Sequence, residues 1–103
     1  MNLGDLLSTT AAGLPDAVAT TAVDGEVTWS RDGRPFAVLR AGGEAVEFGL
    51  DGAVAAAATR TADVVLSGRG SGWVLFRPAA LDDHGADRAA AWFASAHRRL
   101  AGG

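Results

Sequence analysis

The sequence predicts an α+β domain in two layers, with helices covering one face of an antiparallel sheet. Short stretches in the middle of the chain alternate apolar and polar residues and are separated by glycine-containing turns, as in antiparallel strands. Apolar residues near the C-terminus recur instead with the helical period. The order is helix, four strands, helix, two strands, helix, and the 103 residues, 49% of them apolar, suit a single domain with one core.

The first predicted element is a helix over residues 3–12. Leu3, Leu6 and Leu7 fall on one stripe of this helix. Gly13 permits a left-handed cap, and Pro15 prevents the helix from continuing, so we expect the helix to end at this point.

The next segment predicts a four-stranded meander. Asp24-Gly25 is a strong hairpin signal, and further turns are expected at residues 31–34 and 41–43. Turns this short can join only antiparallel neighbours, because parallel strands need long crossovers. The sheet should have one buried and one wet face. The strands are expected at residues 17–23, 26–30, 35–40 and 44–50.

A second helix and a strand pair follow the meander. Asp51 is expected to cap a helix over residues 52–59 that is nearly all alanine, the residue with the best helix propensity. Residues 63–67 and 71–77 are predicted to form a hairpin, which Pro78 ends.

The final helix, over residues 84–101, has the clearest pattern in the chain. Asp82 or Asp83 is expected as its N-cap and Gly102 as the residue after its end. Its apolar stripe consists of Ala89, Trp92, Phe93, Ala96 and Leu100. Because most other apolar residues are small, we expect seven aromatic side chains to form much of the core: Trp29, Phe36, Phe48, Trp73, Phe76, Trp92 and Phe93.

Composition restricts the function classes. The chain has no cysteine, which excludes disulfides and thiolate metal or redox sites. The net charge is −3, and all nine basic residues are arginine. No apolar run is long enough to span a membrane, and the N-terminus lacks a signal-peptide pattern, so we expect a cytoplasmic protein with no membrane partner. The alanine-rich, lysine-free composition is typical of a genome of high GC content.

One segment carries a family resemblance. The strand Gly72-Trp73-Val74-Leu75-Phe76-Arg77 leads through a short polar segment into a closing helix with aromatics, after a meander and a central helix. This arrangement, over roughly residues 27–100, resembles the MmcQ/YjbR-like proteins and their loosely labelled luciferase-type relatives, which are small bacterial domains. The resemblance implies a fold similar to that of secretion chaperones, no demonstrated catalytic role in the luciferase-type group, and for some members DNA binding through a double-wing surface. Trp73 matches the family's tryptophan, but the YjbR group usually places basic residues before it, where this chain has Arg69 alone.

Two segments that suggest chemistry have simpler interpretations. The loop at residues 67–72 is rich in glycine, but a phosphate-binding loop needs a helix after it, and here a strand follows, so we interpret it as a hairpin turn. His84 stands near several aspartates at a helix start, where acidic residues cap the helix. We therefore predict no catalytic residues, no metal and no cofactor, and hence no enzyme.

The arginines suggest a contact surface. One interpretation has Arg31, Arg34 and Arg69 converging with Trp29 on one rim, since guanidinium groups bind carboxylates and phosphates. The other has the arginines scattered among acidic residues and the tryptophans in the core. A small-ligand site lined by Arg31, Arg40, Trp73 and His84 is a further hypothesis. The residues proposed for a ligand or partner surface are Trp29, Arg31, Arg34, Arg40, Arg69, Trp73 and His84.

Together these observations predict a non-enzymatic module that self-associates as a homodimer or binds a protein partner. Edge strands of a small sheet offer a surface for such pairing. The alternatives are nucleic-acid binding of the double-wing type and binding of a small anionic ligand. The charge of −3 argues against nucleic acid, because such proteins usually show a basic stripe and a high pI.

Overall fold

The computed structural model describes residues 2–101, which form six strands and three helices in the predicted order. The N-terminal helix and the meander come first: α1 (Leu3–Ala12), β1 (Val18–Thr21), β2 (Val27–Arg31), β3 (Arg34–Leu39) and β4 (Val46–Gly49). The second part consists of α2 (Gly52–Ala58), β5 (Val64–Leu66), β6 (Trp73–Phe76) and α3 (Asp83–Arg99). No helix among these residues is long and apolar enough to cross a membrane.

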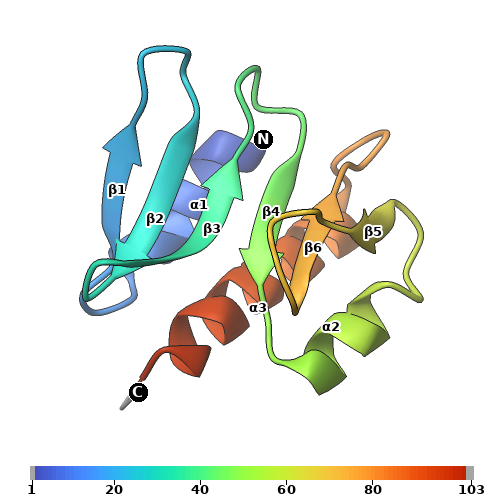
Figure 1. The fold of residues 1–103 in the computed structure, drawn as a ribbon. Coiled ribbons are helices and arrows are strands. Elements are labelled where there is room, and N and C mark those ends of the chain that lie inside the picture. Colours follow the sequence, from blue (N-terminus) through green and yellow to red (C-terminus); the bar gives the residue numbers. More distant parts are fainter. Residues whose placement is uncertain (1, 102–103) are drawn as a thin grey trace.

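All six strands belong to one antiparallel sheet of order β1-β2-β3-β4-β6-β5. The strand β6 pairs with β4, so β5 becomes the outer strand at the edge opposite to β1. Helices α1 and α3 lie behind the sheet, and α2 lies near the ends of β4 and β6 (Figure 1). The predicted two-layer α+β fold is confirmed.

The core lies between the sheet and α1 and α3. Strand register places Trp29, Ala37, Phe48 and Val74 in one row across the sheet, all of them buried. Phe93 of α3 contacts the Trp29 ring edge-on, with a centroid distance of 5.3 Å. Fully burying a side chain of this kind contributes about 1.5–3 kcal/mol. Of the seven predicted core aromatics, five are buried, and Trp73 and Trp92 are half-buried.

Some predicted boundaries need correction. Gly13 follows α1 with a φ of −91°, so the predicted left-handed cap is wrong, and Asp16 instead takes a left-handed conformation with a φ of 61°. Strand β1 is shorter than predicted because the chain already turns at Ala22, whose N–H donates to the Glu26 carbonyl. Asp82, one of the two predicted N-caps of α3, is the actual cap. The role predicted for Gly102 lies outside the described residues.

Candidate functional site

The face of the sheet turned away from α1 and α3 has a buried acid near its centre. The side chain of Glu47 on β4 points to this face, because its neighbours Val46 and Phe48 point into the core. In strand register it lies between Val38 on β3 and Leu75 on β6. The side chain is only 1% exposed. Removing a carboxylate from water costs free energy unless charged partners and hydrogen bonds compensate for the lost hydration.

Three side chains supply that compensation. The Arg40 Nε donates to Glu47 Oε1 at 2.5 Å, and the Arg69 Nε donates to Oε2 at 2.8 Å. The Ser67 hydroxyl also donates to Oε2, at 2.7 Å. We call Arg40, Glu47, Ser67 and Arg69 the open-face cluster. Charge-assisted hydrogen bonds of this kind are about twice as strong as neutral ones.

The loop between β5 and β6 brings two members of the cluster over the sheet. Trp73, at the start of β6, packs on Gly49, where an added Cβ would lie 2.9 Å from the indole carbons. Gly72 has a φ of 80° and approaches Leu50 so closely that a Cβ would lie 2.2 Å from the Leu50 carbonyl oxygen. Both glycines are therefore required for the loop to lie close to the sheet. The guanidinium of Arg69 lies 5.6 Å from the centre of the Trp73 ring, within cation–π range.

The electrostatics of the cluster argue against acid–base chemistry. Burial by itself raises the pKa of a carboxyl group, but the hydrogen bonds from Arg69, Ser67 and Arg40 outweigh it and lower the pKa of Glu47 to about 2. A carboxylate with so low a pKa and with both oxygens occupied is a poor proton acceptor near neutral pH. The cluster is therefore well suited to hold the loop on the sheet.

Three of the predicted surface residues meet at this place: Arg40, Arg69 and Trp73. The two arginine side chains remain 46% and 38% exposed, so part of each guanidinium faces solvent. The sequence interpretation missed Glu47 and Ser67, because Glu47 alternates with apolar neighbours and was expected on a wet face. The only available signal was the tight turn at residues 41–43, which brings the strand of Glu47 back beside Arg40.

The other two predicted arginines of the meander, Arg31 and Arg34, contact the end of α3 instead of the open-face cluster. Arg31 donates to the His97 carbonyl at 3.1 Å, and Arg34 donates to the Leu100 carbonyl at 3.0 Å. They donate to carbonyl groups of the last turn and C-cap of α3; the His97 carbonyl also accepts from the Leu100 N–H. Trp29 is 2% exposed and belongs to the core, so it is not available to a ligand. The interpretation in which Arg31, Arg34, Arg69 and Trp29 converge on one rim is therefore wrong, and Trp29 lies in the core as the other interpretation expects.

His97 is a second buried polar residue, and it does not belong to the predicted ligand or partner surface. Its Nδ1 lies 3.2 Å from an Arg31 nitrogen that can only donate, so Nδ1 accepts. Its Nε2 lies 2.5 Å from the Pro15 carbonyl oxygen and must carry the proton. The histidine thus joins β2, α3 and the loop after α1 in one structural contact.

His84 stays apart from all of these residues. It is exposed in the first turn of α3, whereas Arg31 contacts the last turn, so the predicted ligand site that combines Arg31, Arg40, Trp73 and His84 is wrong as a single site. Asp82 accepts from the Gly85 N–H at 2.7 Å, which fits the capping interpretation. Within residues 2–101, no group of three or more histidine or acidic side chains is arranged to hold a metal ion.

Comparison with known proteins leaves the MmcQ/YjbR resemblance a prediction. No protein-family model matches the chain, and no match was found among curated proteins or solved structures.

Proposed function

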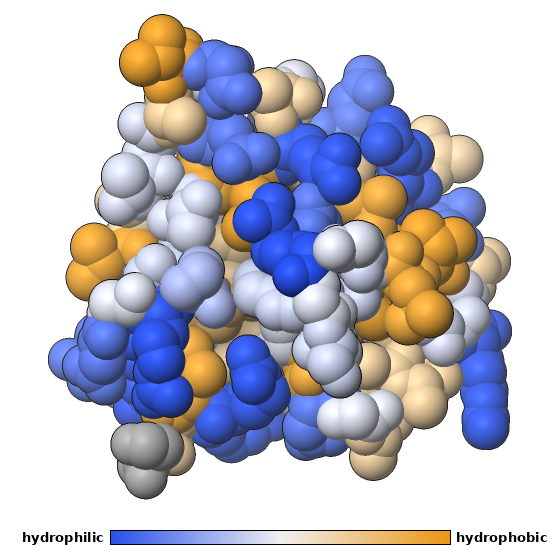
Figure 2. Space-filling model, viewed as in Figure 1, coloured by the Kyte–Doolittle hydropathy of each residue, from blue (hydrophilic) through white to orange (hydrophobic). Residues whose placement is uncertain are grey.

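We propose that the protein is a non-enzymatic self-association module, and that two copies pair along the edge strand β5. The observation that carries the proposal is the exposure of two large apolar side chains on this strand. Val65 is 58% exposed and Leu66 is 74% exposed, although both belong to a regular strand. On the sheet face seen in Figure 2, strongly hydrophobic colours gather over β5, with paler ones over α2 below it. An exposed apolar sheet edge is a template for another strand.

Backbone geometry supports this pairing. The Ser67 N–H donates to the Trp73 carbonyl, and the Arg77 N–H donates to the Asp63 carbonyl. Hydrogen-bonded pairs alternate along an antiparallel ladder, so Val65 bonds to β6 while Val64 and Leu66 direct their backbone groups to the free edge. These two residues offer two donors and two acceptors to a neighbouring strand.

A second copy fits this edge by symmetry. When two β5 strands run antiparallel about a two-fold axis centred on Val65, Val64 of each copy lies opposite Leu66 of the other. The free backbone groups then pair with each other, and the two Val65 side chains meet on one face. An isologous contact of this kind closes after two copies. Because the strand is only three residues long, we expect a weak dimer, with a Kd in the range of about 10 to 100 μM.

The edge strand β1 provides a natural comparison. All four of its residues are exposed, and two of them are threonines. Its one large apolar side chain, Val18, is 59% exposed, almost the same as Val65. We therefore assign the contact to β5, which has two exposed large apolar side chains, one directed to each face of the sheet.

Other features support a non-enzymatic module over the alternatives. Both carboxylate oxygens of Glu47 already accept hydrogen bonds, which makes this residue a poor general base. Five of the nine arginines donate to protein acceptors, which leaves few to bind phosphates: Arg31, Arg34, Arg40, Arg69 and Arg99. The net charge of −3 further weakens attraction to nucleic acid.

Size-exclusion chromatography with light scattering detection tests the proposal at protein concentrations of about 5 to 500 μM. The mass should rise from one protomer toward two, and Val65→Asp should hold it at one protomer by burying a charge in the contact. Val18→Asp is the matched control and should dimerise like the unmodified protein. A single-protomer mass at every concentration, or equal effects of the two substitutions, would contradict the proposal.

A further inference from the structure

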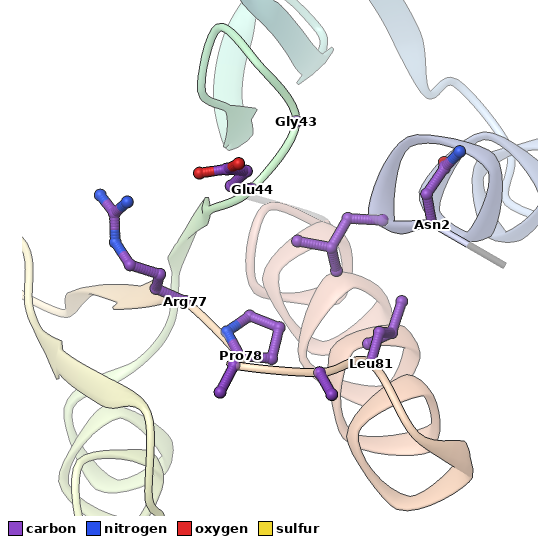
Figure 3. Close-up of a pocket in the computed structure, with 9 residues that line it drawn as sticks. Asn2, Gly43, Glu44, Arg77, Pro78 and Leu81 are labelled. Carbon is purple, nitrogen blue, oxygen red and sulfur yellow. The ribbon is translucent and has the colours of Figure 1, made fainter.

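A pocket lies away from β5, between the start of α1, the β3–β4 turn and the segment that leads from β6 to α3 (Figure 3). Its volume is about 570 Å³, within the range of small-molecule sites. None of the residues that line it belongs to the open-face cluster or to β5. It is therefore independent of the surface proposed for self-association.

The pocket lining has an apolar part and a charged part. The apolar part consists of Leu3, Pro78, Ala79, Ala80 and Leu81. The charged part consists of Glu44 and Arg77, whose polar ends lie near each other at one side of the pocket in Figure 3. Both ion pairs found within residues 2–101 belong to Glu47, so Glu44 and Arg77 are not paired with each other. Two residues of opposite charge thus line the same pocket without an ion pair between them, and both are exposed to solvent.

A second hollow of about 330 Å³ continues from the same pair of residues. Glu44 and Arg77 line both hollows, and Asp24, Glu26 and Arg40 line the second one. Arg40 shares the single Glu47 carboxylate with Arg69, and the second hollow is lined by three acidic side chains and two arginines. The acids therefore make the Glu44 side favourable for a cation, while Arg77 remains the group suited to a carboxylate.

We propose that this pocket binds a free α-amino acid with an aliphatic side chain, such as leucine. An α-amino acid carries an ammonium and a carboxylate on one carbon, which matches two side chains of opposite charge that line one pocket and are not paired with each other. Glu44 receives the ammonium and Arg77 the carboxylate. The aliphatic side chain lies on Leu3, Pro78 and Leu81, where it removes apolar surface from water.

Titration of the whole chain with leucine, followed by amide NMR shifts and calorimetry, tests this inference. We expect saturable shifts in the residues that line the pocket, with a Kd of roughly 0.1 to 1 mM. Glycine lacks the apolar part and should bind about tenfold more weakly or worse. The analogues 4-methylpentanoate and 3-methylbutylamine each lack one charge and should bind about three- to fivefold more weakly.

Substitutions identify the two charged groups. Arg77→Gln and Glu44→Gln should each weaken leucine binding about three- to fivefold, whereas Arg60→Gln, a matched change on the exposed surface, should leave it unchanged. Val65→Asp should bind leucine normally, which separates this site from the dimer contact. The inference is overturned if leucine causes no saturable shift up to about 20 mM. It is also overturned if 3-methylbutylamine binds as tightly as leucine, or if both glutamine substitutions leave the affinity unchanged.

Discussion

Replacing Glu47 with glutamine tests the physical role of the open-face cluster. Glutamine keeps the size of the side chain but removes its charge, and its NH₂ group cannot accept from Arg40, Arg69 or Ser67. The pKa of Glu47 is about 2 in the fold, against an ordinary value of 4.5. Because the folded-state pKa is depressed, the cluster stabilises the protein fully above about pH 4.5, and this stabilisation is lost as the pH falls toward 2. Its magnitude at neutral pH is about 3 kcal/mol.

Urea unfolding, followed by tryptophan fluorescence at several pH values, measures this contribution. We expect Glu47→Gln to lower the free energy of unfolding by about 3 kcal/mol at pH 7, by nearly as much at pH 5, and by roughly half as much at pH 3. Glu44→Gln removes an exposed acid with no ion-pair partner in residues 2–101 and should change stability by less than about 0.5 kcal/mol. The reasoning fails if the Glu47→Gln deficit is below about 0.5 kcal/mol at pH 7. It also fails if that deficit is the same at pH 7 and pH 3.

Two other substitutions test close packing and buried hydrogen bonds. Gly49→Ala should displace the Trp73 ring and lower the free energy of unfolding by about 1–3 kcal/mol, measured by thermal unfolding. At Gly52 an added Cβ has no atom within 4 Å, so Gly52→Ala should be neutral or slightly stabilising. Equal melting temperatures for the two variants would show that the indole is not held against Gly49. His97→Phe keeps an aromatic ring but leaves the Pro15 carbonyl without its donor, so the urea midpoint should fall by the equivalent of about 2 kcal/mol. An unchanged midpoint would contradict a stabilising role of the hydrogen bond from His97 to Pro15.

The order of elements could be predicted because local signals agreed with the tertiary fold. The Asp32-Gly33 turn illustrates this agreement, since both residues have the positive φ that a two-residue hairpin needs. The apolar stripe of α3 was also predicted correctly, since Ala89, Phe93 and Ala96 are all fully buried. Glycine caps were less certain, because Gly13 tolerates a left-handed conformation without requiring it.

Apart from the pair of Arg40 and Glu47, which one short turn brings together, the side-chain partners of the candidate site could not be predicted, because they depend on long-range contacts. Glu47 and Arg69 are 22 residues apart, and they meet only after β6 inserts between β4 and β5. Arg31 and His97 are 66 residues apart and meet only where the end of β2 reaches the last turn of α3. Arginines that look equivalent in the sequence therefore have different roles, some in the open-face cluster and others at the end of a helix.

Amide hydrogen exchange at increasing protein concentration tests the central claim, pairing through β5, most directly. If two copies pair through β5, the Val64 and Leu66 amides, which face the free edge, should exchange more slowly as the concentration rises. The Ala19 and Thr21 amides face the free edge of β1 by the same alternation, because the Ala22 N–H bonds back to Glu26, and they should stay fast at every concentration. Exchange at Val64 and Leu66 that is as fast as at Ala19 and Thr21, and independent of concentration, would contradict pairing through β5.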